Sequence, residues 1–403
     1  MSRYVIVGNG VAGNAAVEVI RKLEPASEIQ MFTKESHIYY YRPALPEYLS
    51  GEKTLKGFTL HDGDWYEKNA VQVHLSTAIA SVRPAEKTVS ASDGRTYAYD
   101  RLLLAAGSHA VVPDVKGSDI EGVFALHTVA DADAMLKRAE TAKSLVVVGG
   151  GILGIEAGNG LRKRGLQVTV IGRNRRLLPK QMDPAGAAFL QRRLEEMGFV
   201  FCLGDTPSEI ARLDGRLAVH LAGGKTLETD MVLLSAGAAP DLSLARQLGL
   251  SIGQAVQVDD RLRTNIEDIY AAGDLVEHRG KVYGIWPAAM EQGRAAGANM
   301  VGKETLYNGT VRSNRLKVSG IDLVSMGDID AEGDGQCLVT ADEKKCVYRK
   351  IVMDGNAITG AILLGDLRGE KEIQQAIASC RDVSSCRSEL DREDFDFRKL
   401  KAP

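Results

Sequence analysis

The chain has 403 residues and a formal net charge of -3, with 50 basic and 53 acidic residues. A chain of this length holds two or three domains, and the lack of excess positive charge argues against nucleic acid as a partner. No apolar run approaches the length of a membrane span, and a strand is expected from Tyr4, where a secretory signal would need a longer apolar segment. We therefore expect a soluble, cytoplasmic protein.

The first informative feature is a glycine-rich turn after a predicted strand. Residues 4–7 form the strand, and the turn Gly-Asn-Gly-Val-Ala-Gly follows directly at 8–13. A helix over 13–23 and a strand over 29–32 complete a βαβ unit. Only glycine allows such close backbone approach to a pyrophosphate, whose charge then lies at the helix N-terminus. The dinucleotide-binding residues that the motif predicts are Gly8, Gly10, Ala12 and Gly13.

A second glycine turn, different in sequence, follows the predicted strand at 145–148. It reads Gly-Gly-Gly-Ile-Leu-Gly over 149–154, before a helix that ends at Gly165 and a strand at 167–171. Two such units in one chain predict two dinucleotides with electron transfer between them. The binding residues predicted at this turn are Gly149, Gly151, Ile152, Leu153 and Gly154.

Other elements are predicted further along the chain. Leucine-rich strands at 101–104 and 231–234 each run into a turn of small residues. Asp183 as N-cap and Pro184 at the first helical position begin a helix that ends near Gly198.

After about residue 310 the pattern changes to short β-type runs, at 321–326, 346–352 and 358–364. These runs predict a separate α+β domain. The last stretch, 389–403, is dense in charge, and we expect it to be solvated.

The two glycine motifs, together with Glu156, Ala105-Ala106-Gly107 and Tyr270-Ala271-Ala272-Gly273-Asp274, resemble the FAD-dependent pyridine nucleotide-disulfide oxidoreductases over roughly residues 1–310. Tyr41-Arg42-Pro43 and residues 307–314 are similar to the NADH:rubredoxin reductase and nitrite-reductase flavin-domain branch. The resemblance implies an α/β fold with two Rossmann-like, glutathione-reductase-like domains and a small α+β C-terminal domain. The implied boundaries are 1–110 with 238–309 for FAD, 111–237 for NAD(P)H, 310–380 for the C-terminal domain and 381–403 for a charged tail.

The resemblance also implies FAD-binding side chains. Glu35, 22 residues after Gly13, would hold the adenosine ribose, unless it is a solvated residue at a strand end. Arg42 would bind the pyrophosphate beside Pro43 and the flavin, or else form an ordinary surface ion pair. Asp274 would bind a ribitol hydroxyl or cap a short helix. The other FAD-site residues expected are Lys34, Ile79, Ala106, Gly107, Gly273, Trp286 and Ala289.

Three of these residues have plain alternatives. Lys34 is otherwise a surface lysine, and Ile79, whose strand pairs its backbone with adenine in the relatives, is otherwise core. Pro287 is expected to begin a helix to about Met300, whose positive N-terminus would face the flavin. Trp286 would then contact the isoalloxazine or pack in the core.

At the second site the expected ligand is a nicotinamide nucleotide. Glu156 corresponds to a family glutamate near the nicotinamide ribose, or is a favourable first-turn carboxylate. The strand at 167–171 should end in an acid that binds the ribose 2′-OH in NADH, but Gly172 and Arg173 follow it. The arginine favours a 2′-phosphate and hence NADPH, whereas the branch resemblance favours NADH. Ala236 and Gly237 complete the expected site.

The expected activity is hydride transfer from NAD(P)H to FAD, with no catalytic side chain or metal, and then electron transfer to a small iron–sulfur protein such as rubredoxin. No cysteine precedes Cys202, so the flavin-adjacent thiol of disulfide reductases is missing. Alternatives are the electron-transfer subunit of a larger oxidoreductase and an NAD(P)H-sensing flavoprotein. The protein would be a monomer or homodimer. Cys380 and Cys386 are expected to be free thiols.

Overall fold

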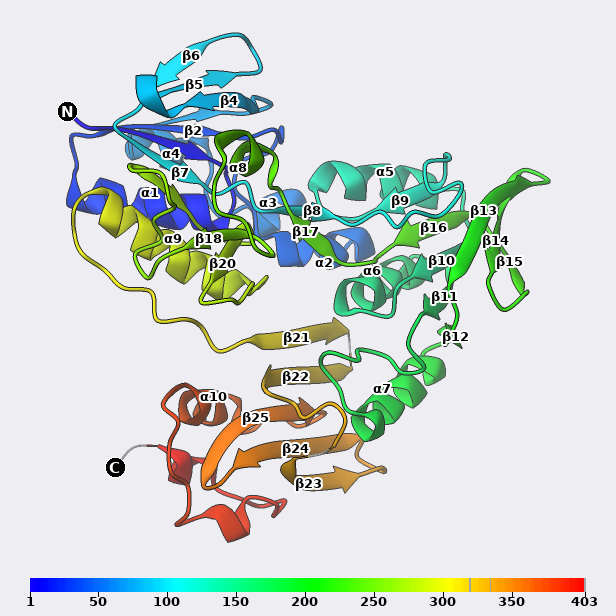
Figure 1. Cartoon of the computed structure of the whole chain (residues 1–403). Coiled ribbons are helices and arrows are strands. Elements are labelled where there is room, and N and C mark those ends of the chain that lie inside the picture. The colour runs from blue at the N-terminus through cyan, green and yellow to red at the C-terminus, as the bar shows by residue number, and fades with distance from the viewer. Residues whose placement is uncertain (319, 334, 402–403) are drawn as a thin grey trace. The chain divides into compact units, whose positions relative to one another are not determined.

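The computed structural model describes residues 1–318, 320–333 and 335–401. Within these ranges, no helix has the length and apolar character needed to cross a membrane. The chain forms two compact units, each assembled from separated stretches of sequence (Figure 1). Unit 1 consists of Met1–Pro43, Thr54–His109 and Ala238–Thr310. Unit 2 consists of Ala44–Lys53, Ala110–Gly237 and Val311–Pro403.

Unit 1 is built on a parallel sheet in the order β19-β7-β1-β2-β3. Its strands are β1 (Arg3–Val7), β2 (Glu28–Phe32), β3 (Val71–His74), β7 (Arg101–Leu104) and β19 (Ile269–Ala271). The expected βαβ unit is confirmed: α1 (Val11–Leu23) connects β1 to the parallel strand β2. Since the neighbouring strands β1, β7 and β19 run parallel, their carboxyl ends meet at one edge, where a doubly wound sheet binds its ligand.

The remaining strands of unit 1 form one antiparallel sheet and two short pairs. The sheet is β4 (Ile79–Arg83), β5 (Thr88–Ala91) and β6 (Thr96–Ala98), and the pairs are β8 (Ser108–Ala110) with β17 (Ala238–Pro240) and β18 (Val256–Val258) with β20 (Val276–His278). The other helices are α3 (Leu55–Phe58), α4 (Gly63–Lys68), α8 (Ser243–Leu248) and α9 (Trp286–Met300).

Helices α1 and α9 pack at backbone contact. A Cβ added at Gly293 would lie 2.2 Å from the carbonyl oxygen of Ala12, and one at Gly297 would lie 2.6 Å from that of Ala16. Because both contacts advance four residues along each helix, the two helices run parallel. Both N-termini therefore lie on the same side of unit 1.

Unit 2 contains a second parallel sheet, in the order β12-β11-β10-β16-β9. Its strands are β9 (Val123–Ala125), β10 (Ser144–Val148), β11 (Gln167–Gly172), β12 (Val200–Leu203) and β16 (Met231–Leu234). The helices are α2 (Leu45–Ser50), α5 (Val129–Ala139), α6 (Ile152–Lys163) and α7 (Pro184–Glu196), and an antiparallel sheet comprises β13 (Pro207–Leu213), β14 (Arg216–Leu221) and β15 (Thr226–Thr229). The expected α7 cap is confirmed, since the Asp183 carboxylate accepts a hydrogen bond from the N–H of Gly186.

The C-terminal part of unit 2 is an antiparallel sheet in the order β21-β22-β25-β24-β23, with helix α10 (Glu370–Ala378). Its strands are β21 (Ser313–Val318), β22 (Ile321–Gly327), β23 (Gln336–Asp342), β24 (Val347–Asp354) and β25 (Ala357–Leu364). The three expected runs are confirmed as β22, β24 and β25. The edge strands β21 and β23 were not predicted, because they are less buried than the strands between them and correspondingly rich in polar residues.

The charge-rich C-terminal segment is not a solvated tail, so that expectation is wrong. Apolar side chains placed between its charges are buried in one cluster with Ile373 of α10 and Leu363 of β25. The buried residues described after residue 380 are Val383, Cys386, Leu390, Phe395, Phe397 and Leu400. Its charges largely pair with each other, as Asp396 does with Arg398, so the apolar residues decide its position.

A buried ion cluster joins the C-terminal sheet to α7 within unit 2. Lys350 on β24 is 1% exposed, and its Nζ lies 3.1 Å from Asp330 Oδ2 and 3.4 Å from Asp183 Oδ2. The hydroxyl of Tyr348 donates to the same Asp183 oxygen at 2.6 Å. Asp183 thus caps α7, pairs with Lys350 and accepts a hydrogen bond from Tyr348, both on β24. The two parts of unit 2 are held by charge as well as by packing.

Replacing Lys350 by alanine should destabilise unit 2 by about 3–5 kcal/mol, because two buried carboxylates lose their cation. The matched control is Lys345→Ala, since exposed Lys345 on the β23–β24 turn pairs with Glu393 and exposed pairs contribute little. Denaturant unfolding of both variants measures the difference. Equal midpoints for the two variants would contradict a stabilising role of the cluster.

Candidate functional site

The first glycine turn lies at the carboxyl end of β1. The chain at the end of the neighbouring strand β7 comes so close to this turn that only glycine fits. Gly8 has φ of 120°, and a Cβ there would lie 2.0 Å from the carbonyl oxygen of Ala105, after β7. A Cβ at Gly13 would lie 2.2 Å from the carbonyl oxygen of Gly8. Gly10 differs, because nothing lies within 4 Å of the position of its Cβ. Two glycines of the motif therefore close the turn, and the third faces open space.

This open space fits the phosphates of a dinucleotide. Helix α1 has Gly10 as N-cap and no side chain capping it, so its first N–H groups remain available to an anion. Beside them, Asn9 has a buried Nδ2 that lacks a hydrogen-bond partner, while its Oδ1 accepts from Tyr66 and Asn14. Asn9 was not predicted as a site residue; the signal that could have identified it is a polar residue between the two glycines.

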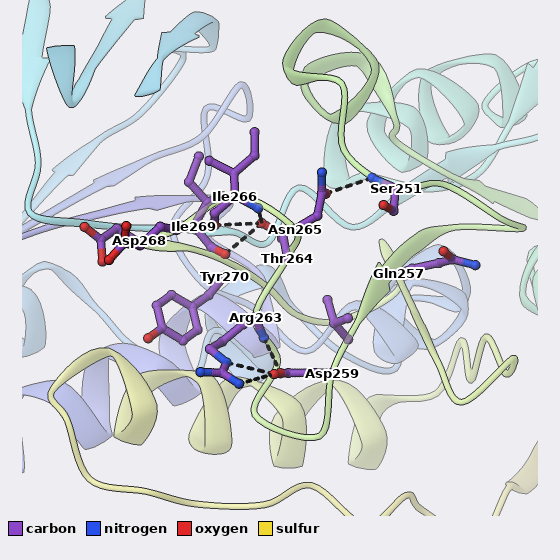
Figure 2. Close-up of a pocket in the computed structure, with 12 residues that line it drawn as sticks. Ser251, Gln257, Asp259, Arg263, Thr264, Asn265, Ile266, Asp268, Ile269 and Tyr270 are labelled. Carbon is purple, nitrogen blue, oxygen red and sulfur yellow. Dashed lines mark hydrogen bonds and ion pairs between the residues drawn. The ribbon is translucent and has the colours of Figure 1, made fainter. Parts of the chain in front are cut away.

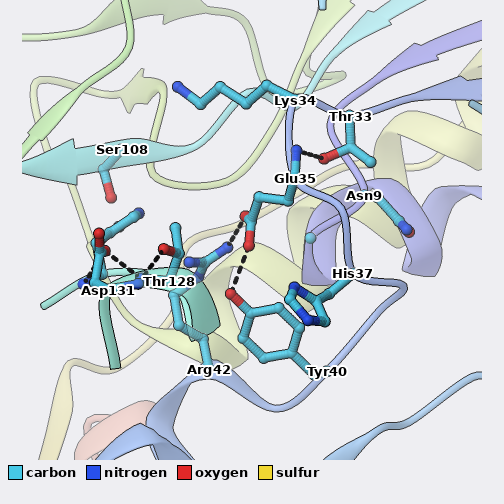
Figure 3. Close-up of polar contacts among 12 residues, drawn as sticks. Asn9, Thr33, Lys34, Glu35, His37, Tyr40, Arg42, Ser108, Thr128 and Asp131 are labelled. Carbon is cyan, nitrogen blue, oxygen red and sulfur yellow. Dashed lines mark hydrogen bonds and ion pairs between the residues drawn. The ribbon is translucent and has the colours of Figure 1, made fainter. Parts of the chain in front are cut away.

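Glu35 and Arg42, expected to hold different parts of FAD, pair with each other in unit 1. Arg42 Nη2 lies 2.6 Å from Glu35 Oε1, and the Tyr40 hydroxyl donates to Glu35 Oε2 at 2.6 Å (Figure 3). The pair is largely buried, with side chains 32% and 19% exposed, so it is not an ordinary surface ion pair. A carboxylate has about four acceptor positions, so Glu35 retains capacity for ribose hydroxyls.

Asp274 follows β19 at the same sheet edge. Its Oδ2 accepts a hydrogen bond from the Ser108 hydroxyl at 3.1 Å. Burial raises the pKa of Asp274, while Ser108 and the charge of Arg42 act to lower it. The alternative role as a helix cap is wrong, since a turn and strand β20 follow Asp274. A half-buried carboxylate that accepts one hydroxyl remains able to accept from a ligand hydroxyl.

Small residues from three segments meet beside this carboxylate. Gly273 has φ of 89°, and a Cβ there would lie 3.2 Å from the Cβ of Ala12 and 3.8 Å from that of Ala289. The N–H of Gly273 donates to Gln292 Oε1 at 2.8 Å. The structure therefore brings together Ala12, Gly273 and Ala289, three predicted site residues that lie far apart in the sequence.

Trp286 is the first residue of α9, one position before the expected start at Pro287. Its ring is parallel to that of Tyr39, with centroids 5.9 Å apart, and meets the ring of Tyr41 edge-on at 4.8 Å. The N-cap Ile285 has no side-chain oxygen, so the first N–H groups of α9 are uncapped. The N-terminus of α9 is thus a second uncapped positive helix end in unit 1.

The other expected FAD residues lie nearby but show no special feature. Lys34 is 62% exposed and pairs with Asp241 at 3.2 Å. Ile79 begins β4 and is buried in the core of unit 1. Gly107 has φ of 72° with open space around its Cβ position, and Ala106 before it is half-buried.

The second glycine turn repeats the arrangement in unit 2. Gly149 has φ of 127°, and a Cβ there would lie 2.1 Å from the carbonyl oxygen of Ser235, after β16. A Cβ at Gly154 would lie 2.4 Å from the carbonyl oxygen of Gly149, while Gly151 faces open space and leaves α6 uncapped. Around this turn, Ile152 is half-buried and Leu153, Ala236 and Gly237 are exposed. The open space at Gly151 and the uncapped N-terminus of α6 fit the phosphates of a second dinucleotide, as the matching features do in unit 1.

Glu156 lies in α6 behind the turn and is 8% exposed. It is the fifth residue of the helix, so the interpretation as a first-turn carboxylate is wrong. Its Oε1 accepts the backbone N–H of Lys317 on β21 at 2.5 Å. Burial raises the pKa of Glu156 to about 7.

Arg173, by contrast, lies on the exposed loop after β11, and its neighbour Gly172 ends that strand. No acidic side chain stands at the end of β11, in agreement with the sequence pattern. A pocket of about 690 Å³ in unit 1 is not a nucleotide site, since it lies at the amino end of β19 and its Arg263 is already paired with Asp259 (Figure 2).

A family model described as pyridine nucleotide-disulphide oxidoreductase matches residues 2–293, and one described as rubredoxin NAD+ reductase C-terminal domain matches residues 313–381. The chain belongs to the pyridine nucleotide-disulphide oxidoreductase family. As a member of that family it binds FAD and NAD(P)H and is a flavoprotein of the oxidoreductase type. Its fold is that of the family, with a C-terminal antiparallel sheet.

Individual members of the family align over most of the chain. A nitrite reductase (NAD(P)H) of Bacillus subtilis is 35% identical over 95% of this chain and 48% of the relative. The rubredoxin-NAD(+) reductase of Pseudomonas putida is 32% identical over 77% of each chain. The crystal structure of NADH:rubredoxin oxidoreductase from Clostridium acetobutylicum matches with a TM-score of 0.80 at 27% identity, over 95% of this chain and 96% of that one. The chain spans about half the length of the nitrite and nitrate reductase relatives.

Glu156 gives a pH prediction for stability. Because folding raises the pKa of this carboxyl from 4.5 to about 7, its contribution is complete below pH 4.5 and is lost as the pH rises to 7, on the order of 3 kcal/mol. Glu156→Gln keeps an oxygen for the Lys317 N–H and removes the charge. The variant should unfold at higher denaturant concentration than wild type at pH 8, with the difference shrinking towards pH 5.

The matched control is Glu195→Gln, which removes a charge from an exposed position on α7. The change in unfolding free energy that Glu195→Gln causes should not grow between pH 5 and pH 8. A stability difference between Glu156→Gln and wild type that stays constant between pH 5 and 8 would contradict the raised pKa of Glu156.

Proposed function

We propose that the protein takes hydride from NAD(P)H at the second glycine turn, through FAD at the first, and delivers electrons to a small iron–sulfur protein. The observation that carries the proposal is that unit 1, which holds the FAD turn, contains no cysteine. The five cysteines all belong to unit 2 and are free thiols. Because unit 1 supplies no thiol to receive electrons from FAD, the acceptor is another molecule.

When bound, FAD supplies the change from two-electron uptake to one-electron release. The chain supplies binding and electrostatics. The uncapped N-termini of α1 and α6 bind the pyrophosphates, and Glu35, Arg42 and Asp274 bind hydroxyl and phosphate oxygens of FAD. The uncapped N-terminus of α9 stabilises negative charge that accumulates beside it.

A second candidate is an electron-transfer domain or subunit of a larger oxidoreductase. It is favoured by the nitrite reductase of Bacillus subtilis, of which the chain covers 48%. In that case the acceptor is an iron–sulfur or other redox centre of the same assembly. Rapid NAD(P)H oxidation with an artificial acceptor, together with poor transfer to isolated rubredoxin, would favour this candidate.

Anaerobic stopped-flow spectroscopy of the FAD-loaded protein tests the proposal. We expect NADH or NADPH to bleach the flavin absorbance within the turnover time, and rubredoxin to restore it. If the protein retains FAD but neither nucleotide bleaches the flavin absorbance, the proposed oxidoreductase activity is excluded and a sensing role remains. Bleaching without reoxidation by any iron–sulfur protein would exclude the proposed acceptor.

The basic loop after β11 predicts a contribution of Arg173 to NADPH binding. Arg173→Glu should shift the ratio of kcat/KM for NADH over NADPH by about tenfold or more, because a charge-assisted contact to a 2′-phosphate is lost and a like charge is added. Steady-state kinetics with both nucleotides measure the ratio. Lys225→Glu, the same charge change on the exposed β14–β15 turn, serves as control and should leave it unchanged.

A further inference from the structure

The basic loop of unit 2 is fixed beside the second glycine turn at both of its ends. At the start, the N–H of Gly204 donates to the carbonyl oxygen of Gly172 at 2.7 Å. At the end, the N–H of Leu178 donates to the carbonyl oxygen of Gly150 at 3.2 Å. Residues 173–176 therefore span the distance between the end of β11 and the phosphate-binding turn. In a dinucleotide-binding fold this is where the ribose nearest the adenine lies.

The three arginines of this loop are not equivalent. Arg173 and Arg175 are exposed, and neither forms an ion pair within the part of the chain that the structure describes. Arg176 is 25% exposed, and its Nη2 lies 2.7 Å from Glu332 Oε1 and 3.4 Å from the carbonyl oxygen of Ala331. Its Nε is buried and has no hydrogen-bond partner. One cation of the loop is thus already neutralised, by an acid from far along the sequence.

That acid belongs to the connection between β22 and β23 of the C-terminal sheet. The connection is anchored from beneath, because Lys350 Nζ donates to the carbonyl oxygen of Asp330 at 2.7 Å and pairs with the Asp330 carboxylate. Lys350 also reaches Asp183 at the start of α7. The buried cluster therefore holds Glu332, two residues from Asp330, against the basic loop.

We infer that Glu332 determines nucleotide specificity by supplying, from the C-terminal domain, the acid that is missing at the end of β11. A carboxylate at this place accepts a hydrogen bond from a ribose 2′-OH and repels a 2′-phosphate. It also occupies Arg176, which a 2′-phosphate would otherwise use. Arg173 and Arg175 act in the opposite direction, so the preference of the site is set by one acid against these two arginines. The inference rests on the proposed nicotinamide role of the second turn.

Equilibrium binding of 5′-AMP and of adenosine 2′,5′-bisphosphate (2′,5′-ADP) to the FAD-loaded protein tests this inference without any turnover. These ligands differ only in the 2′-phosphate, so their affinity ratio isolates its effect. Glu332→Gln should raise the affinity for 2′,5′-ADP relative to 5′-AMP by about three- to tenfold at low salt, where charge interactions are least screened. The change should diminish as salt is added.

Glu343→Gln is the matched control. Glu343 is 71% exposed, as is Glu332, and pairs with an arginine of the same unit, Arg192 on α7, at 3.2 Å. The ratio of the affinities of Glu343→Gln for the two ligands should equal that of wild type. A second variant, Arg176→Gln combined with Glu332→Gln, should lose the gain in 2′,5′-ADP affinity, because the released cation is then absent.

Three outcomes decide the inference. A raised ratio in Glu332→Gln, absent from Glu343→Gln and reversed by Arg176→Gln, supports it. A ratio unchanged by Glu332→Gln, with both ligands binding, overturns it and leaves the nicotinamide role of the second turn intact. If neither ligand binds the wild-type protein, the nicotinamide role fails and the inference fails with it.

Discussion

The close approach of two backbones at each glycine turn is the constraint on which both sites depend. In unit 1 the turn after β1 comes so near the end of β7 that a single Cβ at Gly8 would overlap the Ala105 carbonyl. In unit 2, Gly149 stands in the same relation to Ser235. This contact brings the start of the following helix to the sheet edge, and each further binding residue is placed relative to that helix end. The position of each proposed cofactor site is therefore set first by main-chain packing, and the side chains are placed relative to it.

The parts of the fold that the sequence predicts well are those set by local chemistry. Both βαβ units, the Asp183 cap and the strands of continuous apolar residues follow from turn glycines, capping and periodicity. The edge strands β21 and β23 were missed because they are polar and little buried, and the packed C-terminal segment was missed for a different reason. Residues such as Phe397 are isolated among charges, and their burial depends on a surface formed by distant segments.

The same distinction holds for the candidate sites. The glycines, Asp274 and Glu156 could be named from motifs, but their partners could not. Local sequence does not indicate that Glu35 pairs with Arg42, or that Glu332 reaches a loop about 150 residues earlier. The placement of such charges depends on tertiary contacts, and these decide whether a residue is free to meet a ligand. The roles inferred from motifs therefore needed the geometry before they became specific proposals.

The division of each unit among separated stretches of chain also constrains how the protein is made. The edge strand β19 closes a sheet whose other strands lie before residue 105, and the segment Ala110–Gly237 of unit 2 is synthesised between them. During synthesis the parallel sheet of unit 2 is therefore complete while that of unit 1 still lacks β19 and Asp274. Such long-range pairing slows folding and leaves a partly formed sheet edge exposed. The parallel sheet of unit 1 is accordingly the later of the two parallel sheets to be completed during synthesis.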